Sequence, residues 1–228
     1  MSEPLGPSEG LGVLHLFCKV RPDTDVEAVV AAVKDGQDEQ QQVVCFSVLG
    51  HKADAGFMVL GRDWVRLRRF QSRVQAAGLD VSDSYVSLTE VSEYARASVE
   101  KQKLGPRLYP KLPPAGKRAV CFYPMSKRRS EGANWYQLDF EDRRDLMAEH
   151  GVSGRRFAGR VLQLVTGSTG LDDYEWGVTL FAVHPDDLKE CVYAMRFDEA
   201  SARYAEFGPF YAGTVAEVEE VLADAGLQ

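Results

Sequence analysis

The hydrophobic positions of residues 1–94 alternate between two patterns. Unbroken apolar runs predict strands, whereas apolar residues at intervals of three and four predict helices. The pattern predicts a strand at 13–20, a helix after Asp25, strands at 43–49 and 57–60, a helix after Asp63, and a strand at 85–91. The order β-α-β-β-α-β is that of a ferredoxin-like unit.

The same order recurs after a basic, proline-rich segment. We therefore predict an α+β protein with a ferredoxin-like N-terminal half at 1–94, a linker at 95–117 and a second half at 118–228. Two copies of one unit imply two sheets that pack together or close into a barrel. In the second half we expect strands at 118–123, 161–166 and 176–183, helices at 141–150 and 185–195, a strand within 204–211 and a helix at 215–225.

Composition narrows the class of protein. The net charge of −7 over 228 residues argues against general binding of nucleic acid or membrane surfaces. No apolar run approaches the ~20 residues needed to span a bilayer, and no signal peptide is visible. The four cysteines are widely spaced in apolar stretches, which is typical of reduced, buried thiols. These features predict a soluble cytoplasmic protein.

Charge is distributed unevenly along this acidic chain. Residues 105–160 contain twelve Lys and Arg residues against six Asp and Glu residues. The segment is therefore either a solvated helix face or the cationic mouth of a site for a polyanionic small molecule.

Two segments could carry redox or metal chemistry. Residues 123–127, Y-P-M-S-K, place a phenol, a thioether and an amine at the end of a predicted strand. His150 ends a predicted helix and precedes Gly151, so it either caps that helix or turns its ring into a cavity. One histidine without a second ligand at suitable spacing excludes a His-rich zinc site and suits a haem-type iron.

The remaining polar candidates have ordinary explanations. Gln163 interrupts an apolar strand, so its amide is either paired in the core or directed into a cavity. His15, His51 and His184 are expected to be structural or solvated. The segment 167–170, G-S-T-G, lacks the spacing of a phosphate loop and predicts a hairpin turn.

Longer stretches of the chain resemble the coproheme decarboxylases, the hydrogen-peroxide-dependent haem synthases of the chlorite-dismutase superfamily. The resemblance is carried by Y-P-M-S-K-R-R, N-W-Y, E-H-G, G-S-T-G-L-D-D-Y-E-W-G-V-T-L-F and M-R-F-D-E-A-S-A-R-Y-A-E-F-G-P-F-Y. It implies a dimeric-α+β-barrel-type subunit, a homopentamer, and iron coproporphyrin III (coproheme) bound by the C-terminal half. In that family two propionates become vinyl groups, giving haem b. Coproheme brings its own iron, so no separate metal or nucleotide cofactor is implied, and coproporphyrin ferrochelatase is the expected donor of substrate.

The resemblance also implies roles for individual residues. Tyr123 is the expected catalytic radical, His150 the proximal iron ligand and Gln163 the distal residue. The other expected substrate contacts are Arg107, Pro124, Met125, Ser126, Lys127 and Ser201, with Arg155 and Tyr94 as further propionate contacts.

One departure leaves alternatives open. The linker lacks the histidine that some relatives use to deprotonate peroxide. A haem peroxidase or chlorite-degrading enzyme, and a non-catalytic haem carrier or sensor, are the alternative functions.

Overall fold

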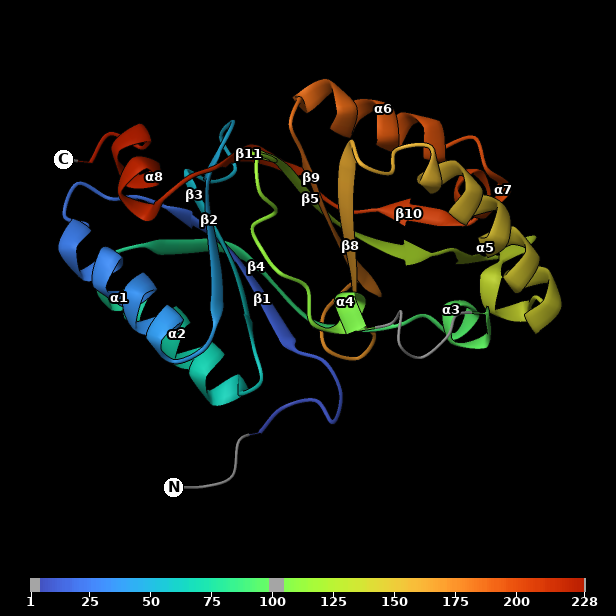
Figure 1. The fold of residues 1–228 in the computed structure, drawn as a ribbon, viewed down its shortest axis with the longest axis horizontal. Helices are drawn as coiled ribbons and strands as arrows, with labels where there is room; N and C mark the ends of the chain where they lie inside the picture. Colours follow the sequence, from blue (N-terminus) through green and yellow to red (C-terminus); the bar gives the residue numbers. More distant parts are fainter. Residues whose placement is uncertain (1–4, 99–104, 228) are drawn as a thin grey trace.

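A computed structural model describes residues 5–98 and 105–227, and its first six elements follow the predicted order (Figure 1). Two helices begin where the sequence predicts them, because the carboxylates of Asp25 and Asp63 accept the backbone N–H groups of Ala28 and Val65, each at 2.9 Å. The elements are β1 (Gly12–Lys19), α1 (Val26–Asp38), β2 (Gln42–Val48), β3 (Ala55–Gly61), α2 (Trp64–Ala76) and β4 (Asp80–Thr89).

The C-terminal half repeats this order with additions. Its main elements are β5 (Ala119–Lys127), α5 (Phe140–Arg155), β8 (Val161–Gly167), β9 (Trp176–Ala182), α6 (Pro185–Met195), β10 (Ala205–Phe207) and β11 (Tyr211–Val215). The smaller elements are α3 (Glu93–Ser98), α4 (Gly105–Leu108), the hairpin of β6 (Arg129–Ser130) and β7 (Ala133–Asn134), a 3₁₀ turn (Trp135–Gln137), α7 (Glu199–Ala202) and α8 (Val218–Asp224). The predicted linker boundaries, 95 and 117, fall between β4 and β5.

The two halves share one sheet, which closes on itself. Its order is β10-β5-β11-β2-β3-β1-β4-β8-β9, and a further pairing of β5 with β9 completes a barrel. The pairs β11–β2 and β4–β8 join the halves, and β10 lies outside the ring beside β5. The predicted α+β fold of two ferredoxin-like halves is confirmed.

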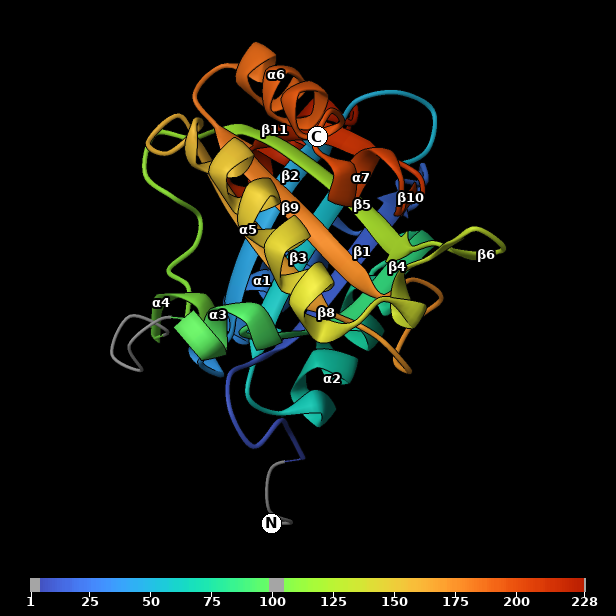
Figure 2. The ribbon, with the colours of Figure 1, turned by 90° about the vertical axis from the view of Figure 1, so that its right-hand side faces the viewer.

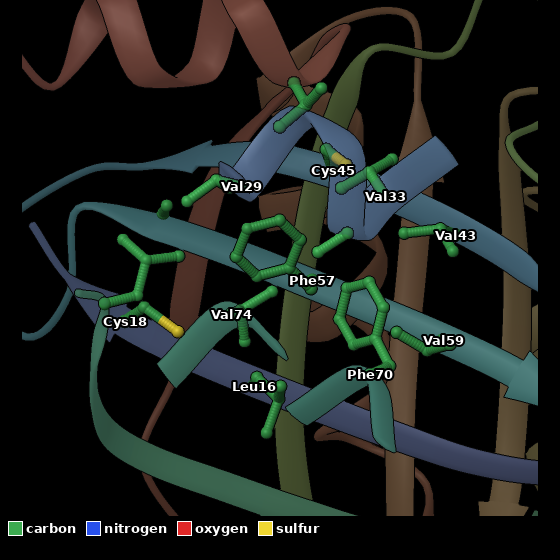
Figure 3. Packing of buried hydrophobic residues seen from close by; sticks show 14 of the residues in the cluster. Leu16, Cys18, Val29, Val33, Val43, Cys45, Phe57, Val59, Phe70 and Val74 are labelled. Atoms are coloured by element: carbon green, nitrogen blue, oxygen red, sulfur yellow. The ribbon is translucent and has the colours of Figure 1, made fainter. Parts of the chain in front are cut away.

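Three layers of apolar side chains hold this arrangement together. On the N-terminal half, α1, α2 and α8 cover one face of the sheet, and Phe57 and Phe70 meet there edge to face (Figure 3). Inside the barrel, Phe17, Phe122 and Phe181 are buried. A third cluster lies on the outer face of β5, β8 and β9, beneath α6. The candidate site is built on that outer face.

β5 is longer than the predicted strand 118–123, so Tyr123 lies inside the strand and not at its end. The strand continues through Pro124, which has no backbone N–H to donate. On that edge β11 pairs with 119–122 and β10 pairs with 125–127, so Pro124 occupies the break between two partners. Its carbonyl still accepts the N–H of Gly208 at 2.9 Å.

Two other predicted boundaries were wrong. The helix expected to end at His150 continues to Arg155, because Gly151 has no positive φ and forms no C-cap. The strand predicted within 204–211 is two short strands, and the second extends to Val215, where the sequence predicted a helix. Thr214 and Val215 are β-branched and pair with β2, which overrides the helical spacing.

The described ranges agree with two expectations from composition. Their helices include none that is both long and apolar enough to cross a membrane. All four cysteines are free and buried.

His15 makes the stability of the barrel depend on pH. The ring is fully buried, its Nε2 lies 3.0 Å from Thr179 Oγ1, and burial lowers its pKa from 6.5 to about 3. The unfolded chain therefore binds the proton more readily, so this contribution is complete above pH 6.5 and is lost as the pH falls toward 3. Between pH 7.5 and pH 5 the loss should be about 2 kcal/mol.

Urea unfolding at both pH values, on the wild type and on His15→Gln, tests this expectation. The variant should lose less stability than the wild type over the same interval, because glutamine does not titrate. Equal losses in the two proteins would contradict it.

Candidate functional site

Helix α5 lies over the barrel without burying any of its own residues. Figure 2 shows it crossing in front of β8 and β9. Beneath it, Gln163 and Val165 point to the same face of β8, and both are exposed. A helix packed directly on a sheet would bury this face, so α5 leaves Gln163 and Val165 uncovered.

His150 lies in the third turn of α5, with one ring nitrogen fixed. Its Nδ1 lies 3.1 Å from both carboxylate oxygens of Asp198 and 3.2 Å from Ser201 Oγ. Asp198 is buried and also accepts the backbone N–H of Ser201 at 3.0 Å, as the N-cap of α7. An Nδ1–H donated to this carboxylate would leave Nε2 to bind a metal.

The face of α5 that carries His150 approaches Gln163. Gly154 is four residues beyond His150 and therefore lies on the same side of the helix. A Cβ built on Gly154 would lie 4.0 Å from Gln163 Oε1 and 3.8 Å from Met195 Cε. Gln163, which the sequence predicted on the opposite side of a ligand from His150, thus lies against α5 about one turn beyond that histidine.

Tyr123 lies in the floor of this region, on β5. Its side chain is 5% exposed and packs between Phe210, whose ring centre is 4.6 Å away, and Phe207, at 5.7 Å. Burial raises the pKa of the phenol well above its usual value, so the hydroxyl is protonated at neutral pH. Within 5–98 and 105–227 it has no hydrogen-bond partner, which leaves its O–H for a ligand.

Arg196, for which the sequence predicted no role, lies beside this tyrosine. Its guanidinium stands 4.6 Å over the ring of Phe207, and its charge lowers the pKa of Tyr123, although less than burial raises it. Both Arg196 and Asp198 fall within the stretch M-R-F-D that carries part of the resemblance. The resemblance therefore included both residues, but their spacing in the sequence could not show that Arg196 lies near Tyr123 and Asp198 near His150.

Lys127 points to the same face of β5 as Tyr123, four residues further on. Its amino group is buried, donates to the Ala200 carbonyl at 2.8 Å and lies 4.2 Å over the ring of Trp135. Burial lowers the pKa of this amine to about 8, although Asp198 and Glu175 oppose the change. The amine therefore connects β5 with the helix that carries Ser201.

The other predicted contacts are more dispersed. Met125 is half-buried on the same face as Tyr123, whereas Ser126 is buried on the opposite face, where its Oγ accepts the Glu175 N–H. Tyr94 accepts a hydrogen bond from Arg143 Nε at 3.2 Å. Arg155 and Arg107 are exposed, on α5 and α4. The roles of Tyr94, Arg155 and Arg107 as propionate contacts stay predictions. The same holds for Ser201, whose hydroxyl lies against His150.

The donor set fits an iron porphyrin better than a bare metal ion. No group of three His, Cys, Asp or Glu side chains in the described part of the chain could hold a metal ion. One histidine backed by a carboxylate can supply a single axial bond, which is what porphyrin iron requires of a protein. The exposed side chains of Gln163 and Val165 on β8 are the surface that such a ring would contact.

A larger side chain between α5 and β8 should block the ligand. Gly154→Leu would project a side chain from α5 toward Gln163 and Met195, and we expect it to abolish the porphyrin-dependent Soret band in a titration of the apoprotein. Glycine in a helix is less favourable than alanine or leucine by up to ~1 kcal/mol, which offsets part of the cost of crowding Gln163 and Met195. Gly105→Leu is the control, because a Cβ at Gly105 meets nothing within 4 Å. Gly132→Leu is not suitable, because Gly132 has a φ of 73°, which strains a leucine. Normal porphyrin binding by Gly154→Leu would contradict a binding site between α5 and β8, which we call the slot.

Comparison with known proteins identifies the family. The model of the family described as Chlorite dismutase matches residues 23–216. The chain is 41% identical over 96% of its length to a protein of Natronomonas pharaonis named for heme binding, although it spans only 41% of that protein. It is 39% identical to the coproheme decarboxylase of Staphylococcus carnosus, over 94% of this chain and 95% of that protein.

Solved structures agree with this match. A heme-binding protein from Thermus thermophilus superposes with a TM-score of 0.88 at 36% identity, over 99% of this chain and 100% of its own. A mutant chlorite dismutase from Candidatus Nitrospira defluvii shares the fold, with a TM-score of 0.76 at 21% identity over 96% and 97% of the two chains. This chain belongs to the chlorite dismutase family.

Proposed function

We propose that this protein binds iron coproporphyrin III between α5 and β8 and uses hydrogen peroxide to convert two of its propionates into vinyl groups, giving haem b. One observation carries the proposal: Tyr123 offers a buried phenol with no hydrogen-bond partner in residues 5–98 and 105–227, on the outer face of the barrel over which α5 carries His150 and its carboxylate. The 39% identity to a coproheme decarboxylase over nearly the whole chain supports the same reaction.

His150 would hold the iron through Nε2. The carboxylate of Asp198 fixes the tautomer and the ring orientation and makes the imidazole a stronger donor, as partners of metal-bound histidines generally do. The bound iron would accept the oxidising equivalents of hydrogen peroxide and pass them to the site. Ser201 completes the contacts of Nδ1, so the ring cannot turn without breaking them.

Tyr123 would act as the hydrogen-atom carrier. Losing one electron and one proton, it would become a neutral phenoxyl radical, which takes a hydrogen atom from the β-carbon of a propionate and is restored. Loss of one more electron from the substrate would then release CO₂ and leave a vinyl group. The aromatic walls of Phe207 and Phe210 exclude water from this phenol, which favours a neutral radical over side reactions.

Basic side chains would hold the propionates. Arg196 is the cation beside Tyr123, and Lys127 retains N–H donors beyond the one it gives to Ala200. Arg155 and Arg107, both exposed, could reach propionates at the rim of the slot. Hydrogen bonds between such cations and carboxylates are stronger than hydrogen bonds between neutral groups. A homopentameric assembly in the cytoplasm, supplied by coproporphyrin ferrochelatase, belongs to the same proposal.

Reconstitution with coproheme tests this function. The apoprotein is loaded with iron coproporphyrin III, hydrogen peroxide is added in small portions, and the porphyrins are extracted and separated by reversed-phase chromatography. We expect coproheme to disappear and haem b to accumulate. Binding without conversion would favour a carrier or sensor, and oxygen release from added chlorite would favour a chlorite-degrading enzyme; either result would overturn the proposal.

A further inference from the structure

The ammonium group of Lys127 stands over an indole ring in the core of the C-terminal half. Nζ lies 4.2 Å from the centre of the Trp135 ring, and both side chains are buried. The amine is held there by its hydrogen bond to the Ala200 carbonyl. Although burial lowers its pKa to about 8, most of it is protonated at pH 7.

This pair lies close to the iron ligand. Trp135 packs with Ala200, the neighbour of Ser201, whose hydroxyl contacts His150. The ring of Tyr204 meets Trp135 edge to face at 5.3 Å. An oxidisable tryptophan, with a tyrosine behind it, therefore lies near the group that peroxide would oxidise.

A fixed cation has opposite effects on the two oxidation states of an indole. It is attracted to the face of the neutral ring. When the ring loses an electron it becomes a radical cation, and the same ammonium then repels it across about 4 Å of protein interior. The repulsion between unit charges at that distance exceeds the amount that changes an equilibrium constant about tenfold.

Tyr123 is affected differently by nearby positive charge. A tyrosine loses its proton together with the electron, so its radical is neutral and a cation does not repel it. The charge of Arg196 lowers the pKa of Tyr123, which shows that it favours loss of the phenol proton.

We propose that Lys127 protects Trp135 from oxidation and so directs the oxidising equivalents of peroxide to Tyr123. The inference rests on the proposed function, because it requires an iron porphyrin bound at His150 and a peroxide. It assigns Lys127 a role beyond contact with a propionate.

The reaction that Lys127 suppresses is a two-electron oxidation of Trp135. The indole and one water molecule together lose two electrons and two protons, and a hydroxyl group from the water replaces one hydrogen of the ring. Hydrogen peroxide accepts two electrons and two protons through the iron porphyrin and becomes two molecules of water. The peptide that contains Trp135 would thus gain the mass of one oxygen atom.

The test uses protein loaded with haem b, which no longer carries the two reactive propionates. Wild type, Lys127→Met and Lys127→Arg are treated with the same few equivalents of peroxide at pH 7, digested and examined by peptide mass spectrometry. We expect about a tenfold or greater rise in hydroxylated Trp135 peptide in Lys127→Met, because repulsion between unit charges about 4 Å apart is lost. Lys127→Arg, which keeps the charge, should stay close to the wild type.

Controls separate this inference from the proposed function. Lys189→Met removes an exposed lysine of α6 and should leave oxidation of Trp135 at the wild-type level. If Lys127→Met does not fold, Lys127→Gln keeps an N–H donor for the Ala200 carbonyl and serves the same purpose. Failure of haem b to give a Soret band with the wild type would count against the porphyrin site itself. A normal Soret band with equal Trp135 oxidation in the wild type and the neutral variants would overturn only the role of Lys127.

Discussion

Tyr123→Phe is expected to bind coproheme normally and to form no haem b when peroxide is added. Phenylalanine keeps the ring that packs against Phe207 and Phe210 but has no O–H bond to give up. Loss of the hydroxyl removes at most one hydrogen bond to the ligand, so the free energy of binding should change by only about 1 kcal/mol. The measurement combines a Soret titration with chromatography of the porphyrin after peroxide.

Tyr193→Phe is the matched control for this variant. It removes the hydroxyl of a tyrosine that is 63% exposed on α6 and lies outside the proposed slot. It should convert coproheme at the wild-type rate. Conversion by Tyr123→Phe at a similar rate would remove Tyr123 from the mechanism and leave the rest of the site in place.

Asp198→Asn should weaken binding of the iron porphyrin by about 10- to 100-fold, the usual effect of losing the partner of a metal-bound histidine. The amide can still occupy the space of the carboxylate, but it has no negative charge to offer His150 Nδ1. His150→Ala should go further and remove the axial bond, which the Soret maximum and the electron paramagnetic resonance of the ferric complex would report.

Asp172→Asn provides a comparison of similar chemistry elsewhere. Asp172 accepts the backbone N–H of Val86 at 2.8 Å, remote from α5, so this variant should affect stability and leave the Soret maximum unchanged. An unchanged spectrum in His150→Ala would show that His150 does not bind the iron.

The repeated order of strands and helices could be predicted because it is written in local patterns. Each ferredoxin-like half carries its own apolar periodicity, and the aspartates before α1 and α2 mark their starts. Closure of the barrel could not be predicted from those patterns. Closure depends on the pairing of β11 with β2 and of β4 with β8. These strands are far apart in the sequence, and their pairing is not visible in its hydrophobic periodicity.

Errors arose where tertiary structure overrides a local signal. Pro124 suggested the end of a strand, yet β5 continues because the proline lies where the strand changes partners. Gly151 suggested a helix cap, yet α5 continues through it. Moving His150 from the helix end to an inner turn changes its chemistry, since Asp198 now orients the ring and the helix terminus does not.

Some residues of the candidate site could be selected from the sequence, and others only from the structure. Tyr123, His150 and Gln163 are chemically unusual in their segments and could be selected from the sequence. Asp198 and Arg196 could not, because an aspartate at a helix start and an exposed arginine are ordinary features. Their importance is visible only where α7 meets α5 and where the end of α6 meets β10.

The fate of the propionate carboxyl carbons tests the proposed decarboxylation most directly. Coproheme labelled with ¹³C at these carbons is bound to the wild-type protein, peroxide is added, and labelled CO₂ is measured by mass spectrometry against the porphyrin present. The proposed reaction predicts two labelled CO₂ molecules for each haem b formed. Peroxide consumption without release of labelled CO₂ would contradict it.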